Sequence, residues 1–130
     1  MGQKSGGRKM SGLKTFLEEL TKKINEKALN LVKEWIGDKY HGKIIEFEVG
    51  DIKGMQKAYH IVFTKKGAKF KEGEYPSPDL IYRSDEETLK GVLAGKIPEK
   101  EVRKTWKLII MGDAHEMDPF SHIVATALKG

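Results

Sequence analysis

Apolar side chains recur every three or four positions between residues 13 and 36, a period that predicts one long amphipathic helix. The apolar stripe consists of Leu13, Phe16, Leu17, Leu20, Ile24, Leu31, Val32, Trp35 and Ile36. Charged side chains such as Glu18 and Lys22 fall mostly on the other side, and Gly37 suits the end of the helix. We therefore expect the stripe to pack against the protein core.

The next segment changes to a period of two, which is typical of strands with one buried face and one wet face. In the first such strand three apolar residues alternate with two glutamates: Ile45, Phe47 and Val49 with Glu46 and Glu48. The same alternation over residues 58–63 and 68–71 predicts two further strands. Short turns separate the three segments, so they are expected to form an antiparallel meander.

The second half of the chain mixes short strands with helices. Ser84, followed by Glu87 three residues later, has the pattern of a capping box and predicts a helix that stops near Gly95. The other expected elements are strands over 79–83 and 107–111 and helices over 98–104 and 119–128. This order predicts an α+β fold, a five-stranded and largely antiparallel sheet with helices packed over one face.

Length and charge limit the function classes that need to be considered. The 130 residues suit a single domain, expected over residues 13–130, and three of the five net positive charges fall within the first ten residues. Residues 1–12, rich in glycine, are expected to form a flexible basic tail. The absence of cysteine excludes disulfides and thiolate chemistry. No apolar run is long enough to cross a membrane, so we expect a cytoplasmic protein.

A motif run in the second half resembles the sterol carrier protein type two family. Residues 78–89 read Pro-Asp-Leu-Ile-Tyr-Arg-Ser-Asp-Glu-Glu-Thr-Leu, followed by Gly-Lys-Ile at 95–97 and Lys-Leu-Ile-Ile-Met-Gly at 107–112. The order of elements over about residues 13–128 is similar to that family as well. Trp106 departs from the pattern, since the family usually has glycine there, and Ile109 and Met111 replace residues that are usually polar.

The resemblance implies a lipid-binding module with an apolar tunnel between sheet and helices. Such a tunnel would hold a sterol, fatty acid, acyl-coenzyme A or isoprenoid lipid, and the protein would sequester and transfer its ligand without chemistry. The residues that match the tunnel wall are Met117, Phe120, Ile123, Val124 and Ala127. The family offers no catalytic residues to carry over, so neither an enzyme nor a cofactor is expected.

Catalytic and metal sites are disfavoured on the residues themselves. Potential ligands gather near the last helix: Asp113, His115, Glu116, Asp118 and His122. A second histidine four residues after His115 would be needed for a zinc-protease motif, and Pro119 stands there. Ser121 and His122 are adjacent, about 100° apart on a helix, so they are poorly placed for a catalytic triad. A polar loop before the helix, without a metal, is the simpler interpretation.

Two alternative functions remain open at this stage. Six lysines without an acid between them would suit a nucleic-acid binder: Lys53, Lys57, Lys65, Lys66, Lys69 and Lys71. The interleaved aromatic residues are in phase with the core, however, which disfavours stacking on bases. Ile109 and Met111 give the last strand apolar residues on both faces, as in a homodimer or another protein interaction module. Scarce amides and abundant Lys and Glu also resemble a heat-adapted composition.

Overall fold

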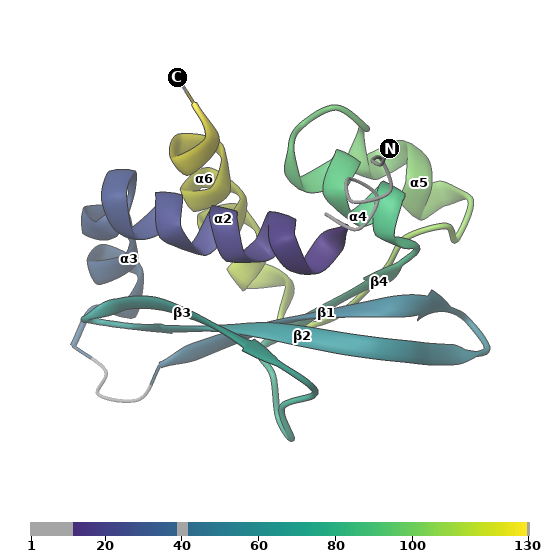
Figure 1. Ribbon diagram of the computed structural model, residues 1–130, viewed down its shortest axis with the longest axis horizontal. Coiled ribbons are helices and arrows are strands. Elements are labelled where there is room, and N and C mark those ends of the chain that lie inside the picture. Colours follow the sequence, from purple (N-terminus) through teal and green to yellow (C-terminus); the bar gives the residue numbers. More distant parts are fainter. Residues whose placement is uncertain (1–11, 39–41, 130) are drawn as a thin grey trace, which may run out of the picture.

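A computed structural model describes residues 12–38 and 42–129, so most of the expected tail, residues 1–11, lies outside the described residues. Five strands form one sheet in the order β3-β2-β1-β4-β5 (Figure 1). The strands are β1 (Lys43–Asp51), β2 (Gly54–Thr64), β3 (Gly67–Glu72), β4 (Leu80–Ser84) and β5 (Ile109–Gly112). All neighbours pair antiparallel except β1 and β4, which are parallel. The α+β class and the antiparallel meander are confirmed.

Helices lie over one face of this sheet and leave the other face without a helical layer (Figure 1). They are α2 (Leu13–Lys27), α3 (Leu29–Ile36), α4 (Glu86–Leu93), α5 (Glu99–Lys104) and α6 (Met117–Leu128), with a single 3₁₀ turn, η1 (Ala114–Glu116). None of the described helices has the length and apolar character needed to cross a membrane. The two-layer arrangement follows from the sequence pattern, since α2, α3, α4 and α6 each carry one apolar face.

The prediction of a single helix over residues 13–36 is wrong. The chain breaks at Ala28, whose φ of −126° and ψ of 18° lie outside helical values, and α3 begins one residue later at a new angle. Asn25 lies just before the break, and its side chain bonds both the N–H of Ala68 (2.8 Å) and the carbonyl of Ala68 (2.9 Å). These bonds hold the end of α2 against edge strand β3, while α3 turns to cover the end of β2 (Figure 1).

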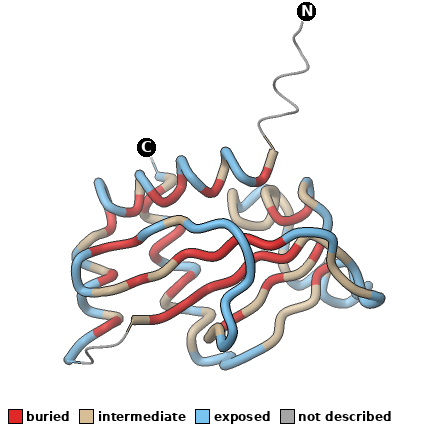
Figure 2. Tube along the Cα trace, turned by 60° about the horizontal axis from the view of Figure 1, so that its bottom comes forward, coloured by how far each residue is buried: buried red, intermediate tan, exposed pale blue. Residues whose placement is uncertain are grey.

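The core lies between the helices and the inner face of the sheet, and buried residues run along the central strands and along the helix sides that face them (Figure 2). The apolar stripe of α2 and α3 is buried there as expected, with Leu13, Leu17, Ile24 and Val32 at 0% exposure. The central strands contribute fully buried residues from the same face, namely Ile45, Phe47, Ile61, Phe63 and Leu80. Burial of this set outweighs the weak intrinsic stability of such short helices.

The other face of the sheet is not uniformly exposed to solvent. Glu46 and Glu48 were expected to be exposed on this face, and that prediction is wrong. These side chains are only 1% and 4% exposed. Because β3 and β4 lie on opposite sides of β2 and β1, the chain between them must cross beneath both strands. On its way Tyr75 donates its backbone N–H to Glu46 (2.7 Å), and the Gly73 carbonyl meets Nδ1 of His60 (2.9 Å). The crossing segment, residues 73–79, thus covers the two glutamates.

The helix that was expected to begin at the cap Ser84 is present, but its cap lies one residue later. Ser84 ends β4, and its hydroxyl donates to the carbonyl of Lys107 (2.6 Å). Asp85 is the N-cap instead, and its carboxylate accepts from the backbone N–H of Thr88 (2.8 Å). Both side chains are good caps. The hydroxyl of Ser84 bonds to Lys107, the residue that leads into β5, so Asp85 is left to cap α4.

Candidate functional site

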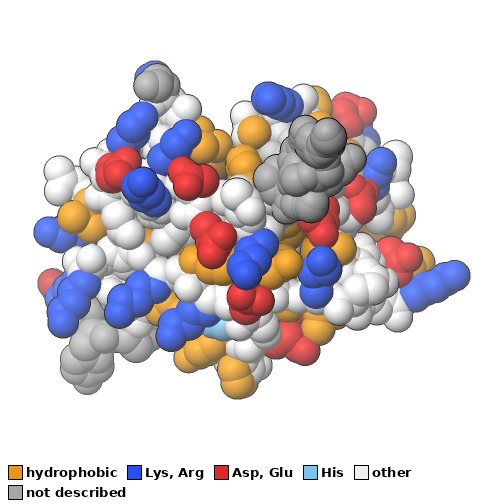
Figure 3. All heavy atoms as spheres, in the orientation of Figure 1, with side chains coloured by type: hydrophobic (Ala, Val, Ile, Leu, Met, Phe, Trp, Pro, Cys, Tyr) orange, Lys and Arg blue, Asp and Glu red, His pale blue; other side chains and the backbone are white. Residues whose placement is uncertain are grey.

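A pocket of about 440 Å³ opens between the second half of α4 and the outer side of α6. Its α4 wall consists of Val92, Leu93, Ala94 and Gly95. Its α6 wall consists of Phe120, Ser121, Val124, Ala125, Leu128 and Lys129. Figure 3 shows hydrophobic side chains gathered in the hollow between these two elements. The volume falls within the range of small-molecule sites, and the lining is mostly apolar.

The two walls stay apart because α4 ends early. Gly95 takes a φ of 76°, in the left-handed region that favours glycine, and the chain turns away from α6 at this point. Ile97 then packs so closely on Gly91 that a Cβ on Gly91 would lie 2.3 Å from it. The α4–α5 connection is therefore folded back on α4 and does not fill the space beside α6.

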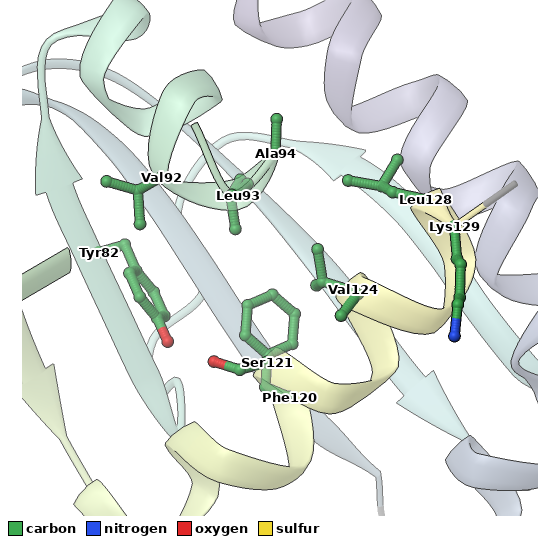
Figure 4. Close-up of a pocket in the computed structure, with 11 residues that line it drawn as sticks. Tyr82, Val92, Leu93, Ala94, Phe120, Ser121, Val124, Leu128 and Lys129 are labelled. Atoms are coloured by element: carbon green, nitrogen blue, oxygen red, sulfur yellow. The ribbon is translucent and has the colours of Figure 1, made fainter. Parts of the chain in front are cut away.

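Tyr82 contributes the floor of the pocket from strand β4 (Figure 4). Its ring stacks on Phe47 with the centroids 5.8 Å apart and is covered by Phe120 at 5.7 Å. Tyr82 is only 2% exposed, and burial raises the pKa of its hydroxyl above the usual range. A hydroxyl in such surroundings stays protonated and acts as a hydrogen-bond donor.

The predicted tunnel residues occupy two different environments. Phe120 and Val124 line the pocket. Ile123 and Ala127 are almost fully buried on the core side of α6, and Met117 is partly buried at its start. Phe120 also packs on Phe63 at 6.0 Å, so aromatic rings occupy the space directly between α6 and the sheet. The open volume lies beside α6, toward α4.

The α4 wall and Tyr82 were missed by the sequence reasoning, which placed the tunnel wall on the last helix alone. One signal was present. Val92, Leu93 and Ala94 are three successive apolar residues, and a short helix cannot turn all three toward one core. At least one of them therefore had to face another apolar surface. The alternation of residues in β4 could likewise have indicated that Tyr82 points inward, but not that it lines a pocket.

The start of α6 is held by a buried polar cluster. Glu116 accepts a hydrogen bond from Nε1 of Trp35 (2.8 Å) and forms an ion pair with Lys43, which is only 7% exposed. Asp113 accepts from the backbone N–H of His115 (3.0 Å), and this bond lowers the pKa of its carboxyl. The expected polar loop before the last helix is present, and its carboxylates are used for structure.

The only group of potential metal ligands that meets within the described ranges lies elsewhere, on the outer face of the sheet. It comprises Glu46, Glu48 and Glu74. Nε of Arg83 donates to Glu48 (2.7 Å), so one of the three carboxylates is already paired. Burial, helped by a hydrogen bond to Glu48, raises the pKa of Glu46 to about 7. A neutral Glu46 bonded to an ion-paired Glu48 accounts for this cluster without a metal.

The lysine-rich hairpin does not present a stacking surface. Tyr59 and Phe63 point to the core with 7% and 0% exposure, and Phe70 packs against Tyr59 from β3. On the opposite edge of the sheet, Ile109 and Met111 are half-buried. Strand β3 of the hairpin and helix α2 border a wider and more open hollow of about 640 Å³. Its lining residues are mostly polar and comprise Glu18, Thr21, Lys22, Asn25, Ala68, Lys69, Phe70 and Lys71.

Comparison with known proteins shows to which family the chain belongs. The family model of the SCP-2 sterol transfer family matches residues 15–125. The chain belongs to this family. No curated protein sequence matches it significantly. The SCP-2 match spans every element described above apart from the first turn of α2 and the last of α6, so the pocket lies between parts of the family fold.

Solved structures resemble most of this chain at low sequence identity. Sterol Carrier Protein 2 from Yarrowia lipolytica (apo form) has a TM-score of 0.62 at 17% identity, over 87% of this chain and 89% of that one. Sterol Carrier Protein-2 from Aedes aegypti, in complex with palmitate, has a TM-score of 0.58 at 14% identity, over 83% and 93%. The sec-alkylsulfatase Pisa1 from Pseudomonas sp. has 0.53 at 17%, over 64% of this chain and 13% of the enzyme. These likenesses establish the fold alone.

Proposed function

We propose that this protein binds an apolar lipid in the pocket between α4 and α6 and transfers it without chemical change. The apolar pocket at the side of α6, in a chain of the SCP-2 family, carries this proposal. Sterol Carrier Protein-2 from Aedes aegypti, which has the same fold, forms a complex with palmitate, and this supports a ligand with a long hydrocarbon chain. Sterols, fatty acids, acyl-coenzyme A and isoprenoid lipids share that character.

The driving force is removal of hydrocarbon from water. Each methylene group that the pocket buries contributes about 0.8 kcal/mol, so even a partly enclosed chain is held well. Val92, Leu93, Val124 and Leu128 supply the apolar contacts. Such side chains hold a ligand by apolar contact and form few hydrogen bonds with it, which suits a carrier that must also release its ligand.

The ends of α6 differ in how firmly they are held, which supports a way for the pocket to open. The first turn is anchored through the buried Glu116, Lys43 and Trp35 cluster. The last turn has an exposed bond from Nζ of Lys27 to the carbonyl of Lys129 (3.3 Å). The exposed bond breaks at low cost, whereas Ala127 is fully buried, so we expect the end of α6 from Leu128 onward to move away from α4 and widen the pocket. Phe120 lies in the anchored first turn, so its ring reaches the widened pocket by rotation of its own side chain.

The test is a variant that fills the pocket from its exposed rim. Ala125 lines the pocket and is exposed, so Ala125→Trp places an indole in the open volume without disturbing the core. Displacement of a fluorescent fatty acid and native mass spectrometry with a lipid panel measure binding. We expect Ala125→Trp to weaken binding at least tenfold. His122→Trp is the matched control, since His122 is exposed on α6 and lies outside the pocket lining.

Two results would contradict the proposal. The wild type could retain no lipid from the panel and fail to displace the probe. Alternatively, Ala125→Trp and His122→Trp could bind as tightly as the wild type, which would place the ligand elsewhere.

A further inference from the structure

The hydroxyl of Tyr82 is buried without a hydrogen-bond partner, and no other buried side-chain nitrogen or oxygen in the described part of the chain shares this condition. Other buried polar side chains are paired: Ser84 donates to the Lys107 carbonyl and Thr21 to the Leu17 carbonyl. Buried hydroxyls are rarely left unpaired, and each exception calls for a reason. Phenylalanine would fill the same space without an unpaired hydroxyl.

The position of this hydroxyl links it to the ligand site. Tyr82 lines the pocket, and its ring extends from β4 toward α6 (Figure 4). The other lining residues with polar side chains, Ser121 and Lys129, are exposed at the rim. Phe120 covers the Tyr82 ring at 5.7 Å, so a ligand that displaces Phe120 reaches the hydroxyl. The Tyr82 hydroxyl is therefore the side-chain donor that a buried polar atom of the ligand would meet inside the pocket.

We propose that Tyr82 donates a hydrogen bond to a neutral oxygen on the buried part of the lipid, so that the pocket selects oxygenated lipids over their hydrocarbon analogues. A hydroxyl or carbonyl oxygen fits this position. This inference rests on the proposed function and names the ligand class for the same site.

Charge distinguishes a neutral oxygen from a carboxylate at this position. A buried anion needs a cation or several donors, and Tyr82 supplies one neutral donor. Glu99 and Arg103 are the charged groups that act on Tyr82, and they are already paired with each other (3.4 Å). Burial raises the pKa of the Tyr82 hydroxyl, so it keeps its proton and acts as a donor throughout the physiological range. An anionic end of the lipid is better placed at the exposed Lys129.

The experiment compares ligands that differ by one oxygen. Two matched pairs are used as competitors of a fluorescent fatty acid: 12-hydroxystearate against stearate, and cholestanol against cholestane, the second pair delivered from cyclodextrin. The wild type is expected to prefer the oxygenated member of at least one pair about tenfold, which corresponds to about 1.4 kcal/mol. Tyr82→Phe is expected to lose this preference while binding the analogues as well as before.

A second readout requires no ligand. Because Tyr82→Phe removes an unpaired buried hydroxyl, its thermal midpoint without ligand is expected to rise above that of the wild type. Tyr59→Phe is the matched control. Tyr59 lies on the same face of the sheet, in strand β2 on the other side of β1, and does not line the pocket, so both the preference and its loss should be specific to Tyr82.

The outcomes separate the two proposals. If the wild type binds both members of each pair equally, or if Tyr82→Phe keeps the preference, the inference about Tyr82 is overturned and lipid binding stands. If neither member of either pair binds the wild type, the proposed function is overturned together with the inference.

Discussion

Glu46 makes the stability of the protein depend on pH near neutrality. Its carboxyl is 1% exposed, and burial together with a hydrogen bond to Glu48 raises its pKa from 4.5 to about 7. The perturbation that isolates this group is Glu46→Gln, since an amide copies the shape of the protonated acid. The amide oxygen still accepts from the backbone N–H of Tyr75, and the amide nitrogen can donate toward Glu48.

The direction of the pH dependence follows from which state of the chain, folded or unfolded, binds the proton. Below pH 4.5 Glu46 is protonated in both the folded and the unfolded chain. Between pH 4.5 and about 7 only the folded chain binds the proton. Stability therefore falls by about 1.4 kcal/mol per pH unit as the pH rises through this window, and levels off above it. A rise in pKa from 4.5 to about 7 corresponds to a total loss of about 3 kcal/mol.

The assay is urea unfolding at half-unit steps from pH 4.5 to 8.5, for the wild type and Glu46→Gln. The difference between the two unfolding free energies removes the contributions of all other groups. We expect the variant to gain on the wild type by about 3 kcal/mol across this range. Glu74→Gln is the control, because Glu74 belongs to the same cluster and is exposed, and it should follow the wild type. Parallel wild-type and Glu46→Gln curves would refute the reasoning.

Two further substitutions test local features of the fold by chemical denaturation. Trp106 is 69% exposed and has a φ of 64°, so Trp106→Gly should stabilise the protein by about 1 kcal/mol, whereas Trp106→Ala, which keeps the Cβ, should not. Asn25→Ala should lower the free energy of unfolding by about 1–3 kcal/mol because it leaves two backbone groups of Ala68 unpaired. A loss below the error of the measurement would show that water replaces the amide freely.

Periodicity predicted the elements that one buried face defines. The alternation around Ile45 and Ile61 fixed which strand residues point to the core, and the stripe from Leu13 to Ile36 fixed the face of the first helices. It could not reveal the break at Ala28. Alanine is a strong helix former, and the break depends on a long-range contact between Asn25 and Ala68.

The candidate site was harder to predict because it depends on two elements that do not adjoin in sequence. The last helix was correctly expected to carry apolar residues toward the interior. Whether those residues leave a space depends on where α4 stops relative to α6, which Gly95 and the contact of Ile97 with Gly91 decide. The burial of Glu46 was missed for the same reason. A period of two shows which face a side chain occupies, but a distant segment decides whether that face is covered.

The parallel pairing of β1 with β4 has a consequence for synthesis of the chain on the ribosome. Strand β1 is complete at Asp51, but its second hydrogen-bonding edge is filled only by Leu80–Ser84. Until those residues emerge, the nascent hairpin carries an unpaired edge rich in Ile and Phe, a template for association with other chains. A fragment that ends before residue 80 should therefore aggregate, and this polypeptide should depend on chaperones most during the middle of its translation.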